Sequence, residues 1–214
     1  GKDKSVPVDE ASLGGVNYST YEKGAKDAKS VITLDEAKAR GINLGTAADG
    51  STSASVKEAS AKGLGYTDTK VDDKGQKVVT TANVKEVGAG DIRFAKSGDR
   101  IDAGVGHANV SGVSYGATTT DASGKVTGSK SASVKDAGLN GVSVGMDSKT
   151  GDMQADVKGA HVNGVAFTEK DGQGKEKTHA TVGSVNVSDI VATGNTKANV
   201  YGAGAGNINV KDID

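Results

Sequence analysis

The sequence predicts an all-β repeat protein in which nine bent β-segments form a single β-repeat domain over residues 1–214. Three observations predict this fold class. One apolar spacing recurs along the chain, glycine recurs at fixed places inside it, and the connectors between copies alternate in length. Internal repetition of this kind is typical of proteins in which one supersecondary unit stacks on the next. We therefore expect an antiparallel meander or prism, in preference to a parallel β-solenoid.

The repeat is a spacing of six apolar residues over thirteen positions, with one residue inside each apolar pair and two residues between pairs. All 54 template positions are apolar, although only 35% of the chain is hydrophobic. The spacing fits nine times without overlap, at Val6–Tyr18, Ile32–Leu44, Ala54–Tyr66, Ala82–Phe94, Ala103–Tyr115, Ala132–Val144, Ala155–Phe167, Ala180–Ala192 and Ala198–Val210.

The two-residue spacers predict bends in each copy. Residues two apart share one face of a β-strand, so an uninterrupted strand would turn the second apolar pair to the opposite face. A bulge or corner in each spacer keeps all pairs on one side. The second spacer often ends in glycine, as at Gly15, Gly41 and Gly63, which permits a positive φ. Each copy is therefore interpreted as three short strands around two bends.

Connector lengths favour an antiparallel path. From one copy to the next they are 13, 9, 15, 8, 16, 10, 12 and 5 residues, so long and short alternate. A chain that runs up and down uses one class of connector at each end, whereas a parallel solenoid places every connector at an equivalent corner. Large residues at the sixth position and alanine at the first would also interdigitate between antiparallel neighbours.

Several connectors contain tight-turn sequences with a late glycine, and these predict hairpin tips: Asp72–Gly75, Asp121–Gly124, Ser148–Gly151 and Asp171–Gly174. Their polar flanks make them candidate binding surfaces.

One segment carries a competing signal. Thr33–Gly41 has a helix cap at Thr33, Glu36 three residues later and a glycine stop, which together favour a short helix. The same residues also satisfy the second repeat copy. A possible short helix near Thr33–Gly41 therefore stands as an alternative within an otherwise all-β chain.

Composition excludes several function classes. Lys and Arg number 26 and Asp and Glu 27, so the chain lacks the basic surface of a nucleic-acid-binding protein, and we expect no nucleic-acid partner. The absence of cysteine excludes disulfides and thiolate metal sites. It fits an exported bacterial protein, for which we expect an extracellular or cell-surface location, and it fits a reducing compartment equally well.

We expect no catalytic, cofactor-binding or metal-binding residues and no cofactor. His107, His161 and His179 are few and scattered, and His161 should point away from the apolar side. The glycine run Gly202–Gly206 lacks the spacing of a nucleotide-binding loop.

Acidic residues gather at Asp72, Asp73, Asp91, Asp212 and Asp214. They match no calcium-binding loop, so we interpret them as solvated turn residues.

Two short stretches, Ala155–Gly159 and Ala108–Gly112, resemble units of the pentapeptide-repeat family, in which an apolar residue is central between alanine and polar residues. That family runs its units without interruption through four-sided coils. Here three units are followed by a connector, the central residue is usually valine, and the surface acidity of its DNA-mimicking members is missing. The resemblance therefore covers single units and implies neither that fold nor that function.

Together these observations predict a non-enzymatic structural or surface-binding module, adhesin-like or spacer-like, whose partner is an unknown protein, glycan or surface ligand. The alternative is a membrane-active or lipid-handling β-protein such as a toxin component, because long amphipathic strands with small apolar residues also suit contact with lipid. The sequence leaves the oligomeric state open.

Overall fold

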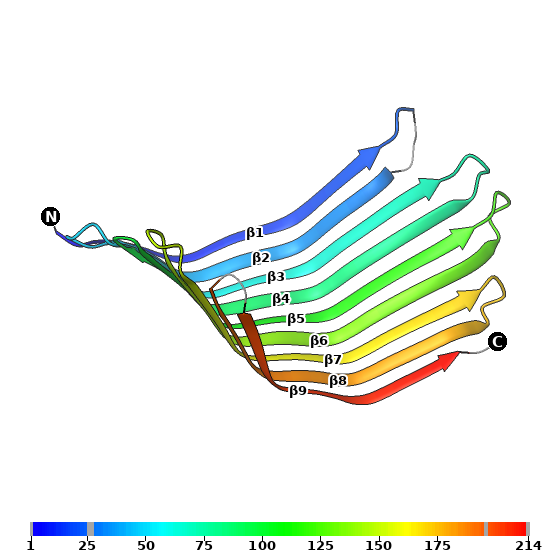
Figure 1. Cartoon of the computed structure of the whole chain (residues 1–214). Coiled ribbons are helices and arrows are strands. Elements are labelled where there is room, and N and C mark those ends of the chain that lie inside the picture. Colours follow the sequence, from blue (N-terminus) through cyan, green and yellow to red (C-terminus); the bar gives the residue numbers. More distant parts are fainter. Residues whose placement is uncertain (1, 25–27, 195–196, 213–214) are drawn as a thin grey trace.

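The computed structural model describes residues 2–24, 28–194 and 197–212, and the chain forms one nine-stranded sheet in the order β1 to β9. Every neighbouring pair is antiparallel and consecutive in sequence (Figure 1). The strands are β1 (Lys4–Tyr21), β2 (Ala28–Thr46), β3 (Thr52–Val71), β4 (Lys77–Ser97), β5 (Arg100–Thr120), β6 (Val126–Asp147), β7 (Met153–Asp171), β8 (Glu176–Thr193) and β9 (Lys197–Asp212). The predicted antiparallel meander is confirmed.

The bends lie inside the strands, so each copy is one long strand and not three short ones. Between β1 and β2, Val8 pairs with Ile42 and Glu10 pairs with Arg40, while Asp9 and Gly41 are left out of the pairing. Both strands thus carry one extra residue at the same place. An extra residue shifts the alternation of side chains by one, which returns the next apolar pair to the same face.

The bend residues have the backbone conformation that the sequence predicts. Gly15, Gly41 and Gly63 have φ of 65°, 61° and 64°. Asp91 (φ 52°) and Asn207 (φ 56°) occupy the equivalent place in β4 and β9. Both residue types tolerate the left-handed region better than most others do. The extra residues of neighbouring strands oppose one another, so two lines of bends cross the whole sheet.

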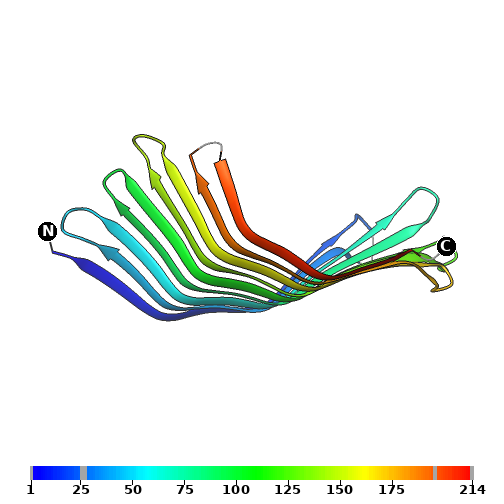
Figure 2. The same ribbon diagram turned by 60° about the horizontal axis from the view of Figure 1, so that its bottom comes forward.

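Two bend lines divide the sheet into a middle panel and two outer panels, and both outer panels turn toward the same side. Figures 1 and 2 show this shallow trough from two directions, with the strands running across it. The spacing of the apolar pairs is the same when read from either end of a strand. Antiparallel neighbours therefore bring apolar positions opposite apolar positions and bends opposite bends.

The register confirms that large residues of one strand lie beside small residues of the next. Tyr66 pairs with Ala82, Tyr115 with Ala132, and Phe167 with Ala180. Phe94 likewise lies between Ala54 and Ala103. From β3 to β7, the first and last apolar positions of the copies thus form alternating large and small side chains along the two margins of the trough.

The alternative of a short helix near Thr33–Gly41 is wrong, because this segment lies in the middle of β2. Its residues pair on both sides, with Ala37 opposite Leu13 in β1 and Ala61 in β3. Two ladders of backbone hydrogen bonds outweigh the local capping signal, as tertiary context often does. A closed prism is not formed either, since β1 and β9 lie at opposite ends of the sheet.

The sheet is a single layer. Among the described residues no hydrophobic side chain is fully buried, and large ones such as Leu13 (57% exposed) and Ile208 (62% exposed) are open to solvent near the two sheet edges. Sheets normally bury one face against a second layer. The apolar side of this sheet is therefore open to a covering layer from outside the described residues.

Candidate functional site

The most distinctive surface is the apolar face, which we define as the side of the sheet that carries the nine copies of the apolar spacing. Its 54 template positions hold no charged or amide side chain. The other side carries the residues between them. Soluble monomers rarely expose a continuous apolar patch above a few hundred Å². A face of nine strands exceeds that, which marks it as an interaction surface.

A hollow of about 500 Å³ lies on the apolar face over the middle panel of β1 to β4. Alanines at Ala11, Ala39, Ala59 and Ala89 form part of its lining, and the short side chains leave room above the backbone. The hollow lies on the side toward which the apolar pairs point, so the trough is lined by apolar side chains. Its volume falls in the range of about 300–1,000 Å³ found for ligand sites.

The opposite, polar face is organised by charge pairs between and along strands. Arg40 Nε donates to Glu10 Oε2 at 2.7 Å across β1 and β2. Glu36 and Lys38, two residues apart on β2, lie 2.7 Å apart, and the Lys38 ammonium lowers the pKa of the Glu36 carboxyl below its usual value. Such exposed pairs contribute little stability each. They keep this face solvated and fix which side faces water.

The histidines lie on the polar face, as expected for His161. A methyl group added at Gly90 or at Gly138 would overlap the ring of His107 or His161. The rings therefore cover glycine backbone in the neighbouring strand. His161 Nε2 is 3.3 Å from Asp136 Oδ1, and His179 Nδ1 is 3.1 Å from Thr168 Oγ1. Each of the three rings thus lies against a residue of a neighbouring strand.

Three of the long connectors end in the same aspartate-anchored turn. Asp72, Asp121 and Asp171 each accept two backbone N–H bonds at one carboxylate oxygen, from the residues two and four positions later. The glycine three residues on has a positive φ in every case. The predicted hairpin tips are confirmed at these positions, and Asp72 has a structural role in its turn.

These turns predict an acid-dependent loss of stability. The Ser123 hydroxyl and the Lys125 N–H lower the pKa of Asp121, and the N–H groups of Gln173 and Lys175 lower that of Asp171. A lowered folded-state pKa stabilises the protein above the unfolded-state pKa of about 3.9, and this stabilisation is lost as the pH falls through the folded-state pKa.

We therefore expect the double variant Asp121→Asn, Asp171→Asn to have a lower Tm than the parent at neutral pH. Between pH of about 5 and about 2, its Tm should change less than that of the parent. Thermal unfolding followed by circular dichroism measures both. The control is Asp73→Asn, in a carboxylate to which the structure assigns no turn hydrogen bond. Parallel Tm curves for parent and double variant would contradict this role of the turns.

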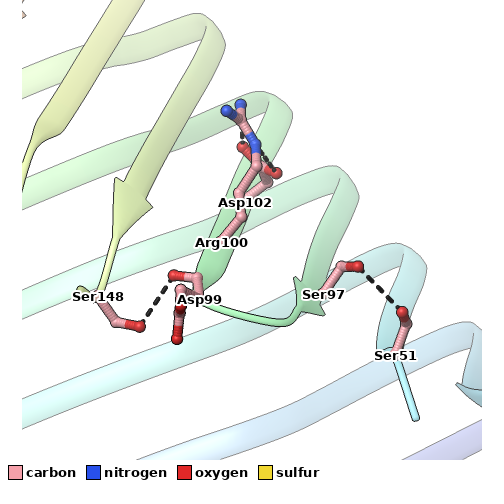
Figure 3. Close-up of polar contacts among 6 residues, drawn as sticks. All are labelled: Ser51, Ser97, Asp99, Arg100, Asp102 and Ser148. Atoms are coloured by element: carbon pink, nitrogen blue, oxygen red, sulfur yellow. Dashed lines mark hydrogen bonds and ion pairs between the residues drawn. The ribbon is translucent and has the colours of Figure 1, made fainter. Parts of the chain in front are cut away.

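The short connectors at the other end of the sheet are joined to one another. Ser51 Oγ donates to Ser97 Oγ at 3.1 Å, and Ser148 donates to the Asp99 carbonyl from its backbone N–H at 2.7 Å and from its hydroxyl at 2.9 Å (Figure 3). These contacts connect hairpins that are up to 49 residues apart in sequence. They hold this end of the sheet as a continuous strip.

A second hollow, of about 650 Å³, lies near these hairpins and is lined by Arg93, Asp102 and Asp156 among others. Arg100 donates twice to Asp102 at 2.8 Å, as Figure 3 shows, and lowers the pKa of that carboxyl. Lys158 Nζ lies 2.7 Å from Asp156 Oδ2. Arg100 with Asp102, and Lys158 with Asp156, thus form ion pairs at this hollow.

The described residues contain no cluster of three or more histidine, cysteine, aspartate or glutamate side chains that could hold a metal ion. Asp91 occupies a bend, Asp212 ends β9, and Asp214 lies outside the described residues. Gly202–Gly206 forms the middle of β9.

Across the part of the chain that the structure describes, no helix is long and apolar enough to cross a membrane. Comparison with family models, curated proteins and solved structures finds no match to this chain. The local resemblance to pentapeptide-repeat units does not extend to the fold, since the strands here are antiparallel neighbours and not successive turns of a coil.

Proposed function

We propose that this chain is a non-enzymatic structural β-repeat module, adhesin-like or spacer-like, that works at an extracellular or cell surface. The observation that carries the proposal is the continuous apolar face on a single-layer sheet. Such a face is an assembly surface, while the polar face and the hairpin tips are left to meet a protein, glycan or other surface ligand.

The regularity of the sheet supports a structural role. Nine strands of 16 to 22 residues pair along almost their whole length, and bends, apolar positions and turns recur at matching places. In repeat proteins each unit is stabilised mainly by its neighbours, so a long array provides a stiff, extended surface. Charged residues such as Arg40 and Glu10 pair across strands, and Asp121 anchors a turn.

The test is a binding screen of the purified protein against immobilised glycans, surface proteins and lipid vesicles. We expect a glycan or protein ligand whose binding weakens when Asp72, Asp121 and Asp171 are replaced together by alanine, because the tips then lose their anchored turns. The control replaces Lys2, Asp73 and Lys149 by alanine, which leaves those anchors in place. Binding to vesicles alone, with leakage of their contents, would contradict the structural proposal.

The alternative function, a membrane-active or lipid-handling β-protein such as a toxin component, has one specific observation in its favour. The hollow over Ala39 and Ala59 is apolar and open on the side facing away from the polar face. An acyl chain has the shape and chemistry to occupy such a space. Vesicle flotation and leakage in the same screen distinguish this function from the structural one.

A further inference from the structure

We propose that a second copy of this chain covers the apolar face, with the two sheets related by a two-fold axis that runs along the trough, across the strands. This inference rests on the proposed structural function and names the partner for its assembly surface. It uses three properties of the apolar face: its area, its lack of charge, and the size of the side chains along its margins.

The area matches a permanent dimer. Strand rise and strand spacing give the apolar face a footprint of roughly 1,200 Å², so two such faces together remove roughly 2,400 Å² from water. Permanent homodimer interfaces bury about 2,000–5,000 Å² and resemble a domain core cut in half. The template positions carry no charge, so contact between two apolar faces buries no unpaired ion from these positions.

From β3 to β7 the margins of the trough alternate in side-chain size, and the two margins alternate out of step. One margin contains the first apolar position of β3, β5 and β7, which is Ala54, Ala103 and Ala155. The other margin contains the last position of the same strands, which is Tyr66, Tyr115 and Phe167. In β4 and β6 the order along the margins is reversed, because these strands run the opposite way.

A two-fold axis along the trough makes this alternation self-complementary. It lays each strand over the same strand of the second copy in the opposite direction, so a first position faces a last position. Tyr115 then faces the second copy's Ala103, and Phe94 faces the second copy's Ala82. Large side chains enter the gaps above alanines on both margins, as packed layers require. The hollows over the middle panels become enclosed between the copies.

The central strand β5 gives the sharpest test. Packed sheets cross at an angle, so strands near the two edges of the sheet diverge from their counterparts while the central pair stays in place. The chain has no cysteine, so Ala103→Cys and Tyr115→Cys can be introduced together and no other thiol can form a disulfide. Oxidation with diamide should convert most chains into a covalent dimer. Sedimentation of the unmodified protein should give twice the 21.3 kDa mass of one chain.

Three results would overturn the arrangement. Cross-linking of the single variant Ala103→Cys to itself would place the axis along the strands. A disulfide within one chain would show that the trough closes on itself. A single-chain mass with extractable lipid would show that lipid covers the face.

A second test enlarges one side chain at the interface and introduces no cysteine. Ala103→Trp fills the gap that receives the second copy's Tyr115, and we expect it to weaken the dimer at least tenfold. Ser114→Trp, on the polar face of the same strand, should leave the dimer unchanged. A dimer unaffected by Ala103→Trp would refute the proposed contact. A well-folded monomer that still binds the ligand of the screen would refute this inference alone, whereas loss of ligand binding in a dimer would refute the proposed function.

Discussion

Gly63→Ala should destabilise the sheet by about 2–3 kcal/mol, because two separate costs meet at one bend. Gly63 has a φ of 64°, a region that costs an ordinary residue about 1–2 kcal/mol. A methyl group there would also overlap the carboxylate of Asp35 on the neighbouring strand. Urea unfolding followed by circular dichroism measures the loss as a lower midpoint.

Two variants separate these costs. Gly15 lies on the same bend line with a φ of 65°, but a methyl group added there meets nothing within 4 Å. Gly15→Ala should therefore lose only the backbone part, about 1–2 kcal/mol. Adding Asp35→Ala to Gly63→Ala should recover the remainder. Equal losses for Gly15→Ala and Gly63→Ala would show that the Asp35 contact carries no cost.

Val134→Asp should cost about 2 kcal/mol or more and reduce assembly, because it places a charge on the apolar face. Val134 lies on β6 between Val113 of β5 and Val165 of β7. The variant loses the burial of valine among its neighbours and brings an unpaired carboxylate to a surface that has no partner for it. Urea unfolding reports the stability, and sedimentation reports the assembly.

The matched control is the adjacent residue, Ser133, which points to the polar face opposite Ser114 and Ala166. Ser133→Asp should change stability by no more than about 0.5 kcal/mol, as is usual for exposed positions. Equal effects of the two substitutions would mean that both faces are solvated alike, contrary to the distinction between an apolar and a polar face.

Much of the fold could be predicted because side-chain alternation is local. Pairs such as Val6 and Val8, followed by a two-residue spacer, already require a bend if the next pair is to share their face. Glycine at Gly112 and Gly141 then indicates where the left-handed residue lies, and both have a positive φ. The use of Asp91 at the same place could not be predicted, since aspartate does not indicate a positive φ as strongly as glycine does.

The candidate site was predictable only in part. The spacing predicts which residues share the apolar face, but it does not say whether the strands close over that face or leave it open. Closure depends on the angle at each bend, where side chains of the neighbouring strand lie close to the backbone, as Lys57 does beside Gly41. The joined hairpin ends were missed as well, because Ser148 and Asp99 are brought together only by the sheet register.

Because the apolar spacing is the same from either end of a strand, strands can be added to the sheet or removed from it in pairs. Removing or duplicating one hairpin, for instance β5 with β6, would leave every remaining strand beside a neighbour of the opposite direction with its bends still aligned. Growth or shortening by whole hairpins therefore preserves the cross-section of the molecule and keeps each class of connector at its own end of the sheet. Gain or loss of a single strand would instead exchange the ends at which the long and short connectors lie for all strands that follow. A gene encoding this chain can thus vary the width of its product in steps of two strands at little structural cost.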